Sequence, residues 1–133
     1  MNNPFGYPGR QWAQAKRQAR AVLVGVAKEE STIAYSELVA EIHAISFDAY
    51  DIRLNTLLGQ ISEAEEGAGR GMLSVVVVHK EGDQCPGLGF FECAEDLGYT
   101  VGDRDEFWIM MLNKVYAYWR ATSSGKVART REK

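Results

Sequence analysis

The chain has little of what metal sites, disulfide frameworks and membrane spans need. Among its 133 residues there are two cysteines, two histidines and three prolines, and no long hydrophobic run. Cys85, Cys93 and His79 lack the close Cys-x-x-Cys or His-x-x-x-His spacing of structural zinc sites. A membrane-spanning helix needs about 18 apolar residues in succession. We therefore expect no metal, no cofactor and no membrane association, and a cytoplasmic protein with reduced thiols.

Length and composition indicate one globular domain. Apolar residues make up 46% of the chain and aromatic residues 11%, and a chain of this length can bury about two thirds of its unfolded surface. Residues 1–9 contain two prolines and two glycines and are expected to form an irregular arm. Residues 10–122 are expected to form the domain, and the polar, basic residues 123–133 a flexible tail.

Charge is distributed unevenly along the chain. Residues 1–28 carry five basic and no acidic side chains, and residues 107–133 carry six basic side chains against Glu132 alone. Residues 29–106 hold 17 acidic and four basic side chains. Two basic ends therefore flank an acidic middle. This pattern fits either a basic patch for an anionic partner or basic helices that pack beside acidic ones.

Apolar spacing predicts several helices. The pattern from Gln11 to Lys28 is that of an amphipathic helix with Lys16, Arg17 and Arg20 on its polar face. Ser36 resembles an N-cap for a short helix that ends near Ala44. Further helices are expected from about Asp48 to Glu66, from Phe90 to Leu97, and from Arg104 to about Thr122.

Residues 72–79, MLSVVVVH, are predicted to form one continuous and central β-strand. Four consecutive valines favour extended backbone, and a strand that is apolar on both faces must be covered on both. Its partner is either Ile33–Tyr35 or a short strand after Gly82. The order of elements is that of a winged helix-turn-helix. We therefore predict an α+β fold, mostly helical, with a winged-helix-like core, a small β-sheet and a long C-terminal helix.

This order of signals resembles the DNA-binding domain of the alkylguanine-DNA alkyltransferases and alkyltransferase-like proteins, over roughly residues 18–98. The family's Tyr-Gly-(Asp/Glu)-(Leu/Val)-Ala segment is matched by residues 35–39, YSELV. Its Pro-Cys-His-Arg-Val-Val segment falls on residues 73–78, LSVVVV. The resemblance implies that Arg53 is the counterpart of the arginine that enters the base stack.

The same comparison argues against alkyl transfer. The position of the family's reactive cysteine is occupied by Ser74, and the position of its activating histidine by Val75. A serine without an adjacent base is a poor nucleophile. The resemblance therefore supports a winged-helix fold more than it supports repair chemistry.

Two further features are candidate chemical sites. Cys85 and Cys93 could be nucleophiles, but neither has a clear base, and buried or half-buried thiols are the simpler interpretation. Gly87-x-Gly89 precedes a helix, where backbone N–H groups can bind an anion. The alternative is a turn that needs positive φ.

Double-stranded DNA is the first partner that the residues suggest. Tyr35, Arg53 and Asn55 are expected on or near the recognition helix, and arginine and asparagine bind guanine and adenine edges. Neighbouring acidic side chains would repel phosphate there. Lys16, Arg17, Arg20 and the basic tail are therefore better electrostatic contacts, unless they form only a solvated face.

The C-terminal helix suggests a protein partner instead. It is apolar around most of its circumference, so we expect part of it, including Trp108, Met111, Tyr118 and Trp119, to form an interface such as that of a homodimer. No paired acid and base or activated nucleophile is visible. The sequence thus favours a non-enzymatic, nucleic-acid-associated or regulatory module, with a protein-interaction adaptor as the alternative.

Overall fold

The computed structural model describes residues 5–48, 51–79 and 86–131, with side chains described as far as residue 121. Within these ranges the chain is mostly helical and has one two-stranded sheet, which confirms the expected α+β class. The elements in order are α1 (Gly9–Lys28), β1 (Ile33–Ala34), α2 (Tyr35–Ala40), α3 (Ile52–Gly67), the 3₁₀ helix η1 (Leu73–Val76), β2 (Val77–Val78), α4 (Leu88–Asp96) and α5 (Arg104–Arg131).

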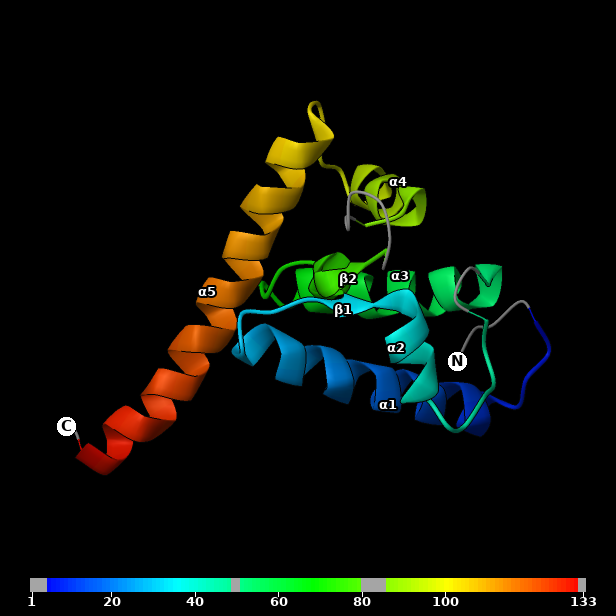
Figure 1. Cartoon of the computed structure of the whole chain (residues 1–133), viewed down its shortest axis with the longest axis horizontal. Helices are drawn as coiled ribbons and strands as arrows, with labels where there is room; N and C mark the ends of the chain where they lie inside the picture. The colour runs from blue at the N-terminus through cyan, green and yellow to red at the C-terminus, as the bar shows by residue number, and fades with distance from the viewer. Residues whose placement is uncertain (1–4, 49–50, 80–85, 132–133) are drawn as a thin grey trace.

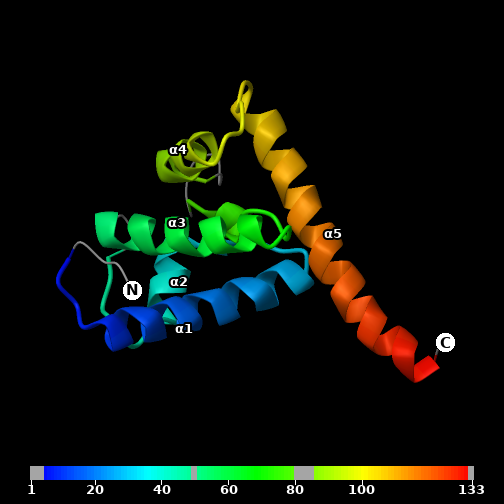
Figure 2. The same cartoon turned by 180° about the vertical axis from the view of Figure 1, so that it is seen from behind.

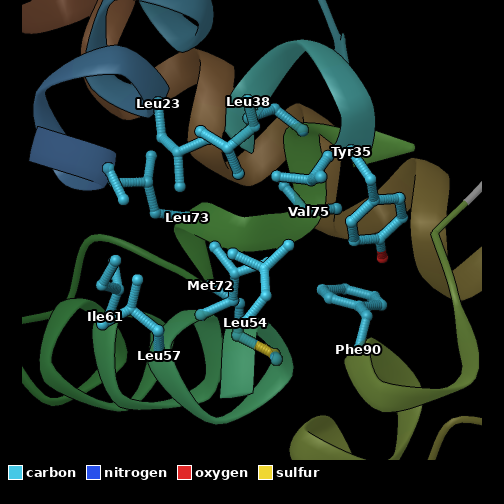
Figure 3. Close-up of a cluster of buried hydrophobic side chains, with 14 of the residues drawn as sticks. Leu23, Tyr35, Leu38, Leu54, Leu57, Ile61, Met72, Leu73, Val75 and Phe90 are labelled. Atoms are coloured by element: carbon cyan, nitrogen blue, oxygen red, sulfur yellow. The ribbon is translucent and has the colours of Figure 1, made fainter. Parts of the chain in front are cut away.

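The core lies between α1 and α3. The two helices run along opposite sides of the segment that holds η1 and β2, and α5 crosses one end (Figures 1 and 2). α1 buries Trp12, Ala15, Ala19, Leu23 and Ala27, which recur every three or four residues and form one face. Figure 3 shows Met72, Leu73 and Val75 between Leu23 and Leu38 on one side and Leu54, Leu57 and Ile61 on the other.

The predicted strand over residues 72–79 is wrong for its first half. Residues 73–76 form a 3₁₀ helix, and only Val77 and Val78 are extended and paired. Their partner is β1, in parallel, with Ile33 opposite Val77 and Ala34 opposite Val78. Because β1 has two residues, the described chain offers the valine segment no longer strand to pair with. A 3₁₀ turn satisfies its own backbone groups instead, as in the Val75 N–H bond to the Met72 carbonyl at 3.0 Å.

The parallel pairing also means that β1 and β2 are not the two sides of a hairpin. Of the two partners expected for the valine segment, the β1 segment is confirmed. The other, after Gly82, begins among residues that lie outside the described ranges.

Two helix starts differ in detail from the expectation. α2 begins at Tyr35, one residue before the predicted N-cap Ser36, and the Glu37 carboxylate accepts the Ala34 N–H at 3.0 Å. α3 begins after Asp51, whose carboxylate accepts the Arg53 N–H at 2.9 Å. Both acids lie at helix N-termini, where orphan N–H groups and the helix dipole favour negative charge.

An ion network joins α1, α3 and the segment after α3. Glu65 on α3 is only 2% exposed. Its carboxylate accepts the Arg20 Nε–H of α1 at 2.7 Å and the Arg70 Nε–H at 2.6 Å. One buried charge is therefore compensated by two arginines, which fixes the spacing of α1 and α3 at this point.

α5 packs across the end of the core through Phe107, Met111, Val115 and Trp119, spaced four residues apart. Arg120 also pairs with Glu30 at 2.9 Å. The helix continues to Arg131, through most of the segment that the sequence suggested as a tail. Within the described ranges, we find no helix with the length and apolar character needed to span a bilayer.

Candidate functional site

Arg53, the expected base-stacking arginine, is held in a local cluster. Its Nε lies 2.9 Å and 3.0 Å from the two carboxylate oxygens of Asp51, and its guanidinium also bonds the Tyr7 hydroxyl. The hydrogen bond from Arg53 holds the pKa of Asp51 well below its ordinary value, and the pKa of Arg53 is raised in turn. The charge of Arg53 is therefore largely compensated within the chain.

Tyr35, from the first segment of the alkyltransferase resemblance, and Ser74, at the position of that family's reactive cysteine, lie at one small cavity. The cavity has a volume of about 10 Å³, which is near the lower limit for a single water molecule. Tyr35 is 7% exposed, and its hydroxyl accepts the Gly87 N–H at 3.0 Å. The cavity is too small for a nucleobase or a comparable substrate.

Ser74 is also engaged in the core. The Ser62 hydroxyl donates to the Ser74 hydroxyl at 2.7 Å, and the Ser74 N–H donates to the Ser62 oxygen at 3.0 Å. Both side chains are buried. This pair satisfies polar groups that would be costly to bury alone, and it gives Ser74 a structural role.

The basic face of α1 is partly neutralised by α3. Lys16 donates to the Gln60 amide oxygen at 2.9 Å, and Arg20 pairs with Glu65. Burial lowers the pKa of Lys16 despite the nearby charge of Glu63. With Arg17, these side chains line a shallow hollow of about 240 Å³. Arg17 is exposed, whereas Lys16 and Arg20 are half-buried.

A larger groove lies between α3 and α4. It has a volume of about 450 Å³, and Asn55, the expected adenine-binding residue, is on its wall. The helices approach closely here, because a Cβ added at Gly89 would lie 3.3 Å from the Asn55 side chain. The complete lining is Ile52, Asn55, Thr56, Gly59, Gln60, Glu63, Gly89, Glu92, Cys93, Asp96 and Leu97.

The charge of this groove has one sign. Glu63, Glu92 and Asp96 supply three carboxylates, and none of the lining residues is lysine or arginine. At the end nearest the start of α3, the Ile52 side chain is 70% exposed, the largest exposure of any large apolar side chain in the described chain. The groove therefore combines apolar surface with an acidic rim. Sequence reasoning missed it, because these residues come from two helices that lie 21 residues apart along the chain.

Cys93 on the groove wall is not activated as a nucleophile. Burial raises the pKa of its thiol, and the charges of Asp96 and Glu63 raise it further. Its Sγ lies 3.9 Å from the Gly59 carbonyl oxygen, a weak contact. Nucleophilic cysteines have the opposite surroundings, with nearby positive charge and a lowered pKa. Cys85 lies outside the described residues.

The Gly87-x-Gly89 segment is at the start of α4, beside a hollow of about 270 Å³ that His79, Arg104 and Trp108 help to line. The Gly87 N–H already donates to Tyr35. The φ angle of Gly87 is an ordinary −75°, so positive φ does not explain why glycine occupies this position. A close approach explains it, because a Cβ at residue 87 would lie 3.3 Å from both His79 Nε2 and the Tyr35 hydroxyl.

The residues expected at an α5 interface lie in different surroundings. Met111 is fully buried and Trp119 is 7% exposed, both against the chain's own core. Trp108 is half-buried, and its Nε1–H donates to the Val75 carbonyl at 3.2 Å. Tyr118 is on the surface, 38% exposed, and Ile109 and Met110, which the sequence did not single out, are 53% and 43% exposed.

Among the residues that the structure describes, no three His, Cys, Asp or Glu side chains lie close enough to hold a metal ion. Comparison with known proteins gives no match to a family model, to a curated protein or to a solved structure.

Proposed function

We propose that this chain is a non-enzymatic protein-binding module, and that its binding site is the groove between α3 and α4. The observation that carries the proposal is the combination of the exposed Ile52 side chain and the half-buried Leu97 with the carboxylates of Glu63, Glu92 and Asp96 around one concave surface. Apolar surface in a groove with a charged rim is a common feature of protein-interaction sites. The module is regulatory or an adaptor.

The charge of the groove defines the partner as a basic and apolar protein segment. An incoming acidic segment would place like charges together, which costs several kcal/mol, whereas lysine or arginine side chains beside the three carboxylates would speed association. Apolar side chains of the segment would cover Ile52 and Leu97, at about 25 cal/mol for each Å² removed from water. A short amphipathic helix with lysines on both sides of a leucine stripe meets both conditions.

The surroundings of the two nucleophile candidates, Ser74 and Cys93, also support a binding role. Ser74 is buried in a hydrogen-bonded pair with Ser62, and the pKa of Cys93 is raised rather than lowered. Neither has the activated environment that covalent catalysis requires.

The test is binding of a synthetic amphipathic lysine–leucine peptide, followed by fluorescence anisotropy, with a glutamate–leucine peptide of the same length as the control. We expect the lysine–leucine peptide to bind and the glutamate–leucine peptide not to bind. Asp96→Lys should weaken the binding of the lysine–leucine peptide by about tenfold or more. Glu95→Lys is the matched control, since Glu95 is the neighbouring exposed acid on α4 and does not line the groove. Equal binding of both peptides, or equal effects of both substitutions, would reject the groove as the site.

Duplex DNA binding by a winged-helix-like core is the second candidate. It is favoured by the order of α2 and α3, by Asn55 on the exposed side of α3, and by the exposed guanidinium of Arg17 on α1. The acidic groove argues against this candidate, because the groove adjoins Asn55 and would repel phosphate. Salt-sensitive binding of duplex DNA that Arg17→Glu weakens, in the absence of peptide binding, would favour this candidate over the protein-binding module.

A further inference from the structure

The hollow between α1 and α3 has a charge opposite to that of the chain. α1 and α3 are neighbours in the fold (Figures 1 and 2), and the hollow of about 240 Å³ lies between them. Three cationic side chains line it against one carboxylate, and these are Lys16, Arg17, Arg20 and Glu65. The lining therefore has an excess of two positive charges, whereas the whole chain has a net charge of −3. A concave surface with charge of one sign concentrates ligands of the opposite sign.

The carboxylate in this lining is already occupied by arginines. Glu65 is 2% exposed, and its oxygens accept hydrogen bonds from Arg20 at 2.7 Å and from Arg70 at 2.6 Å and 3.1 Å. The three side chains together carry one positive charge. Because two cations surround the carboxylate, the network as a whole attracts an anion rather than repelling it.

Two arginines of the hollow have N–H groups to offer a ligand. Arg17 is exposed and makes no hydrogen bond or ion pair with any residue that the structure describes. Arg20 donates through Nε to Glu65, and its two terminal nitrogens donate to none of the described residues. Its guanidinium is also held by the Trp119 ring, whose centroid lies 5.8 Å from Cζ. Planar guanidinium groups bind phosphate through paired N–H donors.

The rest of the hollow supplies a third cation and an apolar floor. Lys16 is half-buried, and its ammonium donates to the Gln60 amide oxygen at 2.9 Å, an oxygen that also accepts the Trp12 Nε1–H at 2.8 Å. The floor between the charged side chains is formed by Ala13, Ile61 and Ala64. A water molecule takes up about 30 Å³ in the liquid, so the hollow has room for an apolar group beside an anionic one.

We propose that this hollow binds a small phosphate monoester, with the phosphate against Lys16, Arg17 and Arg20 and the apolar part of the ester on the floor. A phosphate monoester carries about −1.5 to −2 charges at pH 7, which matches the excess of two positive charges. A carboxylate carries one charge and has one oxygen fewer to accept hydrogen bonds. The proposal does not depend on the protein-binding module, because the groove lies on the α4 side of α3 and, among the described residues, shares Gln60 alone with the hollow.

The test is NMR titration of the isotope-labelled chain with phenyl phosphate at neutral pH and low salt. We expect saturable changes in chemical shift at Ala13, Arg17 and Ala64, which line the hollow. Phenyl phosphate should bind at least about fivefold more tightly than inorganic phosphate, which lacks the apolar group, and than benzoate, which has a single charge. No saturable change, or an equal affinity for either of the other two anions, would overturn the proposal.

Two substitutions locate the binding within the hollow. Arg17→Gln should weaken the binding of phenyl phosphate by about fivefold or more. Arg10→Gln is the matched control and should have less than a twofold effect, because it removes the same charge from an exposed position of α1 that does not line the hollow. Ala64→Glu, at an exposed position of α3, adds a carboxylate to the lining and should abolish binding.

Each variant is checked by circular dichroism for the native helix content. Equal effects of the two arginine substitutions would show attraction by net charge alone and would refute the site, and so would binding that survives Ala64→Glu. Binding of duplex DNA through Arg17 without binding of phenyl phosphate would also overturn the proposal, in favour of the second candidate function.

Discussion

Replacing Glu65 with glutamine is expected to destabilise the fold by about 2–3 kcal/mol near neutral pH. The carboxylate is buried and lies 2.7 Å from Arg20 Nε and 2.6 Å from Arg70 Nε. Removing one member of a buried ion pair typically costs about 3–5 kcal/mol. We expect about 2–3 kcal/mol, because the Arg20 and Arg70 side chains are 41% and 28% exposed and can be partly resolvated once the carboxylate is lost.

The pH dependence of this effect follows from the sign of the pKa shift. Burial alone would raise the pKa of Glu65, but the hydrogen bonds and charges of Arg70 and Arg20 outweigh burial and lower the pKa below its ordinary 4.5. A lowered pKa in the folded state gives stability that is present above the unfolded pKa and is lost as pH falls through the folded pKa. The difference between the wild-type chain and Glu65→Gln should therefore shrink as the solution is acidified below about pH 4.5.

The assay is urea unfolding followed by circular dichroism at a series of pH values. Glu63→Gln, an exposed residue on the same helix, is the control and should change the free energy of unfolding by less than about 0.5 kcal/mol. If Glu65→Gln unfolds with the same free energy as the wild-type chain at neutral pH, or if its deficit does not diminish in acid, the assignment of Glu65 as a compensated buried charge is refuted.

Three further outcomes are expected. Ser62→Ala should lower the free energy of unfolding by about 1–3 kcal/mol, because it leaves the buried Ser74 N–H and hydroxyl without their described partner; a smaller change would imply that Ser74 finds another partner. Gly71→Ala should destabilise by about 2 kcal/mol or more in the same urea assay, since φ there is +90° and the added Cβ would lie 3.0 Å from Val115 Cγ2; wild-type stability would contradict this. Cys93, assayed by peptide mass spectrometry after timed treatment with iodoacetamide near neutral pH, should be alkylated more slowly than a free thiol, because burial and then nearby acids raise its pKa; a rate above that of free cysteine would contradict the shift.

The long amphipathic helices could be predicted from the sequence because one spacing rule determines them. α1 and α3 bury the apolar residues that recur at helical spacing. The sequence predicted the start of this helix at about Asp48, and the N-cap of α3 is Asp51, three residues further on. In these segments local propensity and tertiary packing favour the same structure.

The valine segment could not be predicted in this way, because its conformation depends on its neighbours. β-Branched residues favour a strand wherever a strand partner exists, and here β1 offers pairing for Val77 and Val78 alone. The preceding residues are held by a 3₁₀ turn and by the bond from Ser74 to Ser62, a residue on another element. Burial of the valines was predictable, whereas their backbone conformation was not.

The candidate site was only partly accessible from the sequence for the same reason. Asn55 was identified as a possible contact residue, and it does lie on the groove wall. Ile52, Glu92 and Asp96 were not identified, because an exposed isoleucine and two acids of another helix have no common pattern along the chain. Met111 and Trp119 were expected at an interface, but α5 places both side chains against the chain's own core.

The central claim, that the groove between α3 and α4 binds a basic, apolar protein segment, is tested most directly by NMR titration of the isotope-labelled chain with the lysine–leucine peptide. The account predicts that the saturable changes in chemical shift cluster at Ile52, Thr56, Gly59, Gly89 and Cys93, which line the groove, and that Asp96→Lys reduces them while Glu95→Lys does not. No saturable change, or changes confined to α1 and α5, would contradict it.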